Sequence, residues 1–285
     1  MAASPEMSVS YVVSAYKNLD QLARLVRVLA RDSAPVAVHI DKKTDDRAYS
    51  KLVSDLSSMS SVRFLERHTC HYGGFGHVQA TLKGIDDLVA RAPNFSHLVL
   101  LTGQDYPIKP LAEIRAFFDS NAGRSYMGHN ALPSPLWSPR GGLDRIEYRH
   151  LRWRGKHLRL PGRRRFPREL VPYGGGAYWC LSRECVEIVS AFVGERPDVV
   201  RFFERVDVPD EIFFQTIVMN SELAPTVVND NLRYIDWSRG PRPAVLDLAD
   251  LEALRRSPKL LARKFDTRID ARVLDAIDRE LLAGG

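Results

Sequence analysis

The stretch VSYVVSAYKNLDQLARLVRVLARDSAPVAVHI, residues 9–40, combines two apolar runs with a helical pattern between them. Val9–Ala15 and Val36–Ile40 are rich in β-branched residues, which is typical of buried strands. Leu19–Leu29 has apolar residues at positions 19, 22, 25, 26 and 29, the spacing of one helix face. A strand, a helix and a second strand in this order predict a parallel βαβ unit.

The same alternation continues to about residue 120. The patterns predict helices over Tyr49–Leu56, Val78–Val89 and Pro110–Phe118, and strands over Val62–Leu65 and His97–Leu101. We therefore expect an α/β fold with a mostly parallel central sheet and helices on both faces. In such sheets ligands bind beyond the carboxyl ends of the strands.

The second half of the chain is less regular. Residues 130–172 are rich in Pro, Gly and Arg, and we expect them to form an irregular basic insertion. Beyond it we expect strands at Gly175–Leu181 and Leu232–Trp237, and helices at Arg183–Val193, Pro209–Met219, Leu248–Arg255 and Ala271–Leu282. No internal repeat or separating linker is evident, so residues 1–285 are predicted to form a single domain.

Composition excludes several classes of protein. With 45% hydrophobic and 27% charged residues, the chain is unlike a disordered or collagen-like sequence. Apolar runs such as Leu98–Leu101 are far shorter than the roughly 20 residues of a membrane helix. Residues 1–7 lack a signal-peptide pattern. The three cysteines, Cys70, Cys180 and Cys185, cannot all pair and lack zinc-ligand spacing, so we expect a reducing, cytoplasmic location.

Two aspartates follow predicted strands. Asp41 follows Ile40, where a carboxylate can bind a nucleotide base or ribose, although a turn-forming aspartate is equally consistent. Asp105 lies in Thr102-Gly103-Gln104-Asp105-Tyr106-Pro107, at a position where many nucleotide-sugar transferases carry Asp-x-Asp. A single carboxylate makes a metal site less favourable there, and a turn before Pro107 is the alternative.

Tyr72-Gly73-Gly74-Phe75-Gly76 precedes a predicted helix. Glycines allow a backbone to approach a ligand closely, and helix N-termini favour anions. The segment lacks the Gly-Lys-Ser/Thr of a phosphate-binding loop, so a plain tight turn is the competing interpretation.

Residues 149–168 carry nine Lys or Arg and no acid, within a chain of net charge +6. A solvated loop is one interpretation; a flap over an anionic ligand or a membrane surface is the other, so peripheral membrane contact stays open. No nucleic-acid-binding motif accompanies these charges, and we expect no nucleic-acid partner.

Two further groups of charges remain. Asp210 and Glu211 begin a predicted helix, where acids complement the helix dipole, but a carboxylate in a cleft can also accept a proton. Arg233, Arg263 and Lys264 are either surface charges or cations that neutralise a diphosphate.

Taken together and in this order, these segments resemble a known family, although no single segment is sufficient to show the resemblance. Over about residues 9–268 the chain resembles the core-2/I-branching β-1,6-N-acetylglucosaminyltransferase family, which also contains the peptide O-xylosyltransferases, and is similar to a bacterial-type member. The resemblance lies in YVVSA (11–15), HIDKK (39–43), YGGF (72–75), LTGQDYPIK (101–109), GGAYW (175–179), PDE (209–211) and ARKFD (262–266).

The resemblance implies a GT-A, Rossmann-like fold and inverting, metal-independent transfer from a UDP-sugar to a hydroxyl group. No cofactor or metal is implied. A glycan, a lipid-linked sugar or a secondary metabolite would be the acceptor.

The resemblance also assigns roles to residues. Glu211 corresponds to the general base, and Lys264, Arg233 and Arg263 correspond to cations on the diphosphate. The remaining implied contacts are with the nucleotide, at Ser14, Ala15, Asp41, Tyr72, Gly73 and Asp105, and with the sugar or acceptor, at Asp210, Tyr178 and Trp179. Trp179 is equally consistent with a core position.

Two departures from the family pattern bear on function. The xylosyltransferases carry an acid where this chain has Ala177, which favours N-acetylglucosamine as the sugar. The animal members have a membrane anchor and disulfides that this sequence does not show. The alternatives are a xylosyltransferase-like donor preference and a non-catalytic protein that binds UDP-sugars or glycans.

Overall fold

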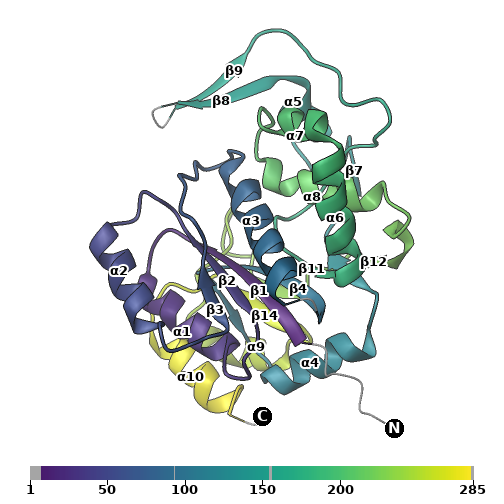
Figure 1. Cartoon of the computed structure of the whole chain (residues 1–285). Helices are drawn as coiled ribbons and strands as arrows, with labels where there is room; N and C mark the ends of the chain where they lie inside the picture. The colour runs from purple at the N-terminus through teal and green to yellow at the C-terminus, as the bar shows by residue number, and fades with distance from the viewer. Residues whose placement is uncertain (1–7, 93, 154–155, 284–285) are drawn as a thin grey trace. The chain divides into compact units, whose positions relative to one another are not determined.

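The computed structural model describes residues 8–92, 94–153 and 156–283 (Figure 1). The chain divides into two compact units. Unit 1 comprises Met1–Arg67, Leu88–Ala122 and Leu232–Gly285, and unit 2 comprises His68–Asp87 and Gly123–Asn231. The single domain expected over residues 1–285 stays a prediction.

A parallel sheet is the centre of unit 1. Its strands are β1 (Ser8–Ala15), β2 (Val36–Ile40), β3 (Val62–Phe64) and β4 (Phe95–Thr102), in the order β4-β1-β2-β3. All three pairings are parallel. Every side chain of β2 is buried, as expected for a central strand of such a sheet. The predicted α/β class with a mostly parallel sheet is confirmed.

Helices complete unit 1. They are α1 (Leu19–Leu29), α2 (Asp46–Asp55), α4 (Leu111–Ser120), α9 (Leu251–Arg256) and α10 (Arg272–Glu280). The bounds of α1 are those predicted, because its apolar face is buried as a continuous stripe. Helix α2 begins at Asp46 rather than at Tyr49, since the Asp45 side chain accepts a hydrogen bond from the Ala48 N–H and caps the helix. Figure 1 shows α1 and α2 beside each other.

A second, smaller sheet in unit 1 has the order β13-β14-β5. Its strands are β13 (Arg233–Ile235), β14 (Leu261–Arg263) and β5 (Asp105–Pro107). The sequence patterns predict neither β5 nor β14, because three residues are too few for a periodicity. The pairing of β14 with β5 sets Arg263 opposite Asp105.

Unit 2 packs short strands against helices. Helix α3 (Gly76–Arg91) begins in it and ends in unit 1. Its elements also include β6 (Ser125–Met127), β7 (Asn130–Ala131), β10 (Tyr173–Gly174), β11 (Trp179–Ser182), β12 (Val227–Val228), α6 (Arg183–Glu195), α7 (Pro197–Phe203) and α8 (Phe213–Met219). An aromatic cluster forms its core: the rings of Phe203 and Phe213 lie 5.1 Å apart, and those of Trp179 and Phe214 lie 5.3 Å apart.

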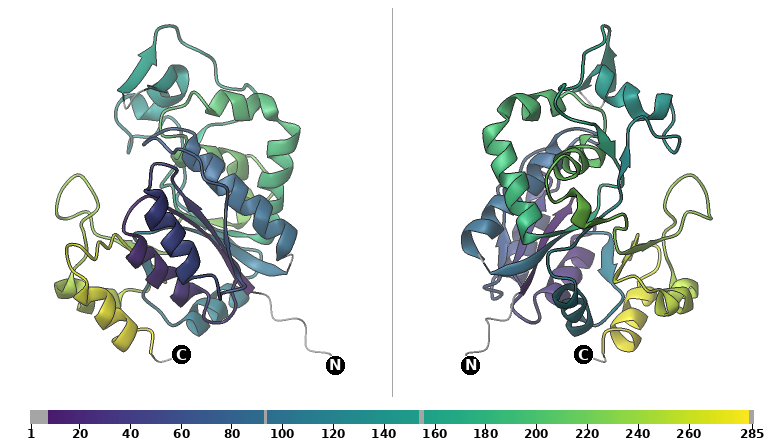
Figure 2. Two further views of the ribbon diagram at one scale, coloured as in Figure 1. Left: turned by 60° about the vertical axis from the view of Figure 1, so that its left-hand side comes forward. Right: turned by 90° about the vertical axis from the view of Figure 1, so that its right-hand side faces the viewer.

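The expectation of an irregular insertion at 130–172 needs correction. This segment contains α5 (Leu143–Glu147) and an antiparallel hairpin of β8 (Arg149–Trp153) and β9 (Lys156–Leu160), which projects from unit 2 in Figures 1 and 2. The basic side chains of this segment are also not all exposed to solvent, whereas one interpretation of residues 149–168 expected them to be. Arg164 donates to the Ile146 and Phe202 carbonyls, and burial lowers its pKa to about 10. Arg154 lies outside the described residues.

The predicted helix at Pro209–Met219 is two elements. Pro209–Glu211 forms a single 3₁₀ turn, and α8 starts only at Phe213 because Ile212, at φ −133°, interrupts the helix. Asp210 and Glu211 therefore lie in a tight turn and do not occupy the first turn of an α-helix. Val208, just before the turn, has φ +50°, which is uncommon for a β-branched residue.

Across the part of the chain that the structure describes, no helix combines the length and the apolar content needed to cross a bilayer.

Candidate functional site

The Glu211 carboxylate in unit 2 is held by an ion pair and is also accessible to solvent. Its Oε2 accepts a hydrogen bond from Arg145 Nη1 at 2.7 Å, and a third of its side chain is exposed. Arg145 comes from α5 and stacks on the ring of Trp137 at 4.3 Å. The ion pair fixes the orientation of the carboxylate and leaves part of it open to a substrate.

The pKa values of both acids in this turn, Asp210 and Glu211, are raised. Burial raises the pKa of Glu211, and the ion pair with Arg145 opposes that rise. Burial raises the pKa of Asp210 to about 6. Among the described residues Asp210 Oδ1 has no hydrogen-bond partner, so its charged form is poorly stabilised. Adjacent carboxyl groups with raised pKa values are typical of sites that transfer protons.

Glycine-rich loops hold the backbone of this turn. The Gly175 N–H donates to the Glu211 carbonyl at 2.9 Å, and the Val208 N–H donates to the Gly73 carbonyl at 3.0 Å. A Cβ on Gly175 would lie 1.8 Å from the Gly128 carbonyl oxygen, so only glycine fits there. The glycines around Gly73 and Gly175 thus position the segment that carries Glu211.

The predicted aromatic contacts differ in exposure. Tyr72 is 85% exposed and Tyr178 is half-buried, so both present surface to solvent. Trp179 is fully buried in β11 against Phe214. The core interpretation of Trp179 therefore holds, and we correct its assignment as a sugar-facing residue: its indole offers no surface.

In unit 1 the carboxyl ends of three strands are joined by backbone hydrogen bonds. The Asp41 N–H donates to the Ala15 carbonyl at 2.9 Å, and the Gly103 N–H donates to the Ser14 carbonyl at 3.1 Å. This brings together Ser14, Ala15 and Asp41, as their positions at strand ends predict. The buried Asp41 carboxylate also accepts from the Lys43 N–H at 2.9 Å, which is the turn-forming role. Its contact with a nucleotide stays a prediction.

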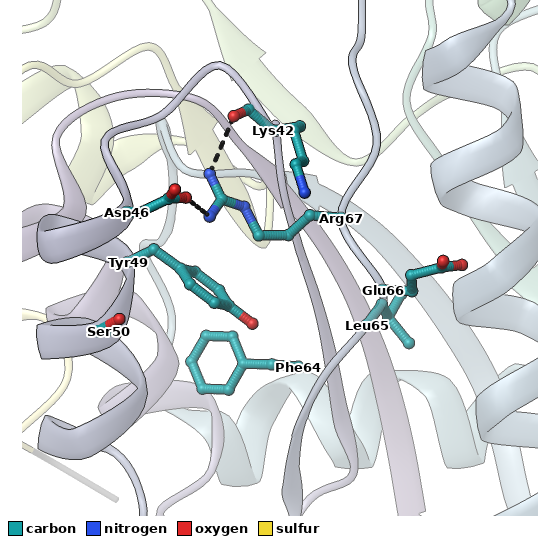
Figure 3. Close-up of a pocket in the computed structure, with 8 residues that line it drawn as sticks. All are labelled: Lys42, Asp46, Tyr49, Ser50, Phe64, Leu65, Glu66 and Arg67. Atoms are coloured by element: carbon teal, nitrogen blue, oxygen red, sulfur yellow. Dashed lines mark hydrogen bonds and ion pairs between the residues drawn. The ribbon is translucent and has the colours of Figure 1, made fainter.

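An arginine fixes the loop that follows Asp41. Arg67 donates to the carbonyls of Asp41 at 3.1 Å and Thr44 at 2.5 Å, and its guanidinium stacks on Tyr49 at 4.3 Å. Arg67 and Tyr49 also border an open cavity of about 450 Å³ (Figure 3). Arg67 thereby links the loop after β2 to helix α2.

Asp105 and Arg233 form an internal ion pair. The Asp105 carboxylate accepts from the Thr102 N–H at 2.7 Å and from Arg233 Nε at 3.3 Å, and both charged side chains are fully buried. Arg233 also donates to the Leu100 carbonyl. We therefore correct the expectation that Asp105 and Arg233 contact the UDP-sugar, because neither side chain is accessible. Arg263, almost as buried, lies 3.9 Å from Asp105.

Lys264 is the more accessible cation of this group. It is half-buried, and its pKa is lowered first by burial and then by repulsion from Arg263, Lys17 and Arg242. Three further cations therefore lie near enough to Lys264 to shift its pKa, and this concentration of positive charge suits an anionic ligand. Lys17 and Arg242 are not predicted from the sequence, because no motif marks them.

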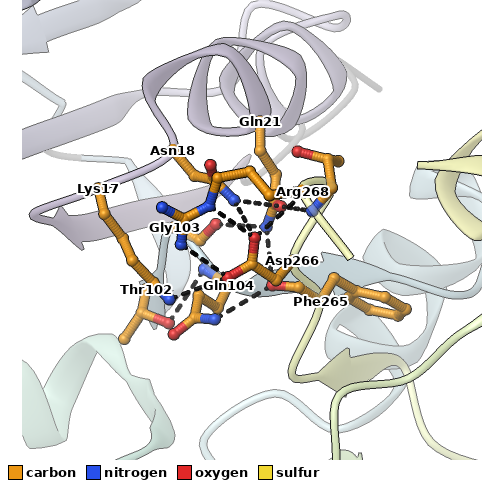
Figure 4. Close-up of polar contacts among 10 residues, drawn as sticks. Lys17, Asn18, Gln21, Thr102, Gly103, Gln104, Phe265, Asp266 and Arg268 are labelled. Atoms are coloured by element: carbon orange, nitrogen blue, oxygen red, sulfur yellow. Dashed lines mark hydrogen bonds and ion pairs between the residues drawn. The ribbon is translucent and has the colours of Figure 1, made fainter. Parts of the chain in front are cut away.

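A polar network fixes the backbone beside Lys264. Asp266 accepts from Lys17 Nζ at 3.0 Å and Asn18 Nδ2 at 2.6 Å, and Gln21 Nε2 donates to the Gly103 carbonyl at 2.8 Å (Figure 4). The surrounding positive groups hold the pKa of Asp266 far below its usual range. The ends of β1 and β4 are thereby tied to the segment that follows Lys264.

Comparison with known proteins places the chain in a family. Residues 9–254 match the model of the Core-2/I-branching enzyme family. Xylosyltransferase 2 of Homo sapiens is 25% identical over 97% of this chain and 34% of its own length. The xylosyltransferase of Ciona intestinalis is 24% identical over 92% of this chain and 32% of its own. The chain spans about a third of the length of these relatives.

Among solved structures, A197 from STIV covers 64% of this chain and 68% of its own, at 11% identity and a TM-score of 0.28. That likeness is too weak to bear on the fold.

Proposed function

The chain belongs to the Core-2/I-branching enzyme family, and on this premise we propose that it is an inverting glycosyltransferase that uses a UDP-sugar donor. The observation that carries the proposal is Glu211: a partly exposed carboxylate, held by Arg145, whose pKa is raised by burial. A base of this kind takes the proton of an acceptor hydroxyl most effectively when its pKa approaches the working pH.

In the proposed reaction the acceptor oxygen attacks the anomeric carbon of the donor in line with the leaving group. The new carbon–oxygen bond forms as the bond to the UDP oxygen breaks, with its electron pair going to UDP. The hydroxyl proton goes to the Glu211 carboxylate. Arg145 keeps that carboxylate oriented and disfavours its protonation before the acceptor arrives.

Cations of unit 1 neutralise the charge that develops on UDP. Lys264 takes the direct role, supported by Lys17 and Arg242, which share its surroundings. Fixed charges of this kind act without reorganisation during the reaction, so we propose that no metal ion is needed. The buried Asp105–Arg233 pair holds β5 and β13 in place and does not itself touch the donor.

The transferred sugar is proposed to be N-acetylglucosamine, because Ala177 stands where the xylosyltransferases carry an acid. Xylose is the second candidate, since the curated relatives named above are xylosyltransferases. The acceptor is a hydroxyl of a glycan, a lipid-linked sugar or a secondary metabolite.

A glutamine substitution at position 211 tests the proposed base. Glu211→Gln keeps the hydrogen bond to Arg145 but cannot accept a proton, so kcat should fall by about 10²- to 10⁴-fold. UDP affinity, measured by calorimetry, should be unchanged. Glu222→Gln, at an exposed acid of the same unit, is the control. Normal turnover in Glu211→Gln would exclude the residue as the base.

A panel of UDP-sugars, scored for donor hydrolysis and for thermal stabilisation, tests the donor. Stabilisation and hydrolysis with UDP-N-acetylglucosamine but not UDP-xylose support the proposal, and the reverse pattern supports the second candidate. Binding of UDP-sugars without any turnover would instead indicate a non-catalytic binding protein.

A further inference from the structure

Two histidines of the β8–β9 hairpin and an aspartate lie close together. His150 lies in β8, His157 in β9 and Asp207 after α7. The distance from His150 Nδ1 to His157 Nε2 is 2.8 Å, and that from His157 Nε2 to Asp207 Oδ1 is 3.6 Å. One potential ligand atom from each residue lies within 4.8 Å of the other two. None of the three has a role in the proposed transfer.

The orientation of His150 is fixed from the opposite side of its ring. Its Nε2 lies 3.1 Å from the Asp144 carbonyl, which can only accept a hydrogen bond. Nε2 therefore carries the proton, and Nδ1 directs its lone pair toward His157. Metal-binding histidines are typically held in this way, by a carbonyl on the other ring nitrogen. His150 is also buried, and its backbone N–H donates to the Arg205 carbonyl at 2.8 Å.

The separations suit a small tetrahedral ion. Two ligand atoms at zinc-bond lengths lie about 3.4 Å apart in a tetrahedral site. The separations of 2.8 Å and 3.6 Å lie on either side of that value, and the third pair, from His150 and Asp207, lies within 4.8 Å. Two imidazoles with one carboxylate favour zinc and similar transition metals over magnesium, whose ligands are oxygens.

We propose that His150, His157 and Asp207 bind one divalent transition-metal ion of the zinc type, with solvent as the fourth ligand. Without the ion, the Nε2–H of His157 donates a hydrogen bond to His150 Nδ1. When the ion binds, this proton moves to Nδ1 of His157 or is released to solvent, and both lone pairs then point to the metal. Arg152 donates a hydrogen bond to Asp207 Oδ1 and so holds this carboxylate beside the two imidazoles. A cavity of about 140 Å³ that borders His150 and Arg152 has room for solvent.

The ion would connect two parts of unit 2. Asp207 lies four residues before Glu211, and its N–H donates to the carbonyl of Arg145, the partner of Glu211. Metal binding would tie the hairpin to this segment. The site is distinct from the cations proposed to stabilise UDP, so it is compatible with transfer that needs no metal at the diphosphate.

Metal titration of the chelator-treated full chain tests the proposal. We expect one Zn²⁺ per chain by calorimetry, a rise in Tm with Zn²⁺, and with Co²⁺ the visible absorption of a tetrahedral site. Substitution of a residue that only supports a metal ligand typically weakens metal binding by about 10- to 100-fold. His157→Gln removes a ligand itself and should weaken Zn²⁺ binding at least as much. His71→Gln, at a histidine of the neighbouring cavity, is the matched control and should bind as the wild type does.

Two results would overturn the site: no stoichiometric binding to the wild-type chain, or equal binding by wild type and His157→Gln. Because His157 is partly exposed, its substitution should leave the fold intact, which circular dichroism verifies. Asp207→Asn provides a second variant and should weaken binding similarly. None of these readouts depends on transferase activity, so failure of this site leaves the proposed function separately testable.

Discussion

Glu211 is subject to two opposing influences. Burial favours its neutral form, whereas Arg145 at 2.7 Å favours the carboxylate. The net effect is a raised pKa, so the group is a better base than an exposed glutamate and is still able to ionise. Arg145 therefore acts as a positioning residue.

Asp210 should make stability depend on pH. Its pKa of about 6 exceeds the unfolded value of 3.8, so the folded state binds the extra proton and stability is lost as pH rises from about 4 to 6. Asp210→Asn removes the charge. We expect a higher Tm than wild type at pH 8 and little difference at pH 4. The exposed Asp119→Asn should show no such pH-dependent gain. A lower Tm at pH 8 would show that the charged form is well stabilised.

Lys264 is expected to contact the diphosphate rather than the nucleoside. Lys264→Ala should weaken UDP binding far more than uridine binding, since removing one preorganised donor typically costs about 3–4 kcal/mol. Calorimetry with both ligands measures the difference. Lys51→Ala, at an exposed position on α2, is the control and should leave both affinities unchanged. Equal losses for UDP and uridine in Lys264→Ala would contradict the assignment.

At the scale of elements, short segments carry much of the organisation. The three-residue strands β5 and β14 bring Asp105 and Arg263 into register. The 3₁₀ turn at Pro209–Glu211 presents two acids that an α-helix would direct differently. Helix α2, in turn, supplies the Tyr49 ring on which Arg67 stacks while it holds the loop after β2.

The cap of α2 should contribute measurably to stability. Asp45→Ala removes the acceptor for the Ala48 N–H and should lower the free energy of unfolding by about 1 kcal/mol. Urea denaturation measures the change. Asp55→Ala breaks only an exposed pair with Lys51 and should lower stability less than the cap variant does. A cap variant as stable as wild type would mean that solvent replaces the lost bond.

At the scale of the whole molecule, the lack of an Asp-x-Asp sequence at Asp105 and the cation group around Lys264 lead to the same expectation. Transfer should continue in EDTA. The assay is best run on both wild type and His157→Gln, because the variant lacks the proposed zinc site. If EDTA abolishes the activity of the His157→Gln variant and Mn²⁺ restores it, metal-independent transfer is refuted.

The sequence by itself determined the α/β class, the parallel strands of unit 1, helix α1 and the candidate acids, because periodicity and strand-end positions are local properties of the chain. Only the tertiary structure decided which charges meet. Arg145 and Glu211 are 66 residues apart, and Asp105 and Arg233 are 128 apart. Such pairings arise when separate elements pack. The same packing buried Trp179 and Arg233 and brought His150 and His157 next to Asp207, and no local pattern encodes that outcome.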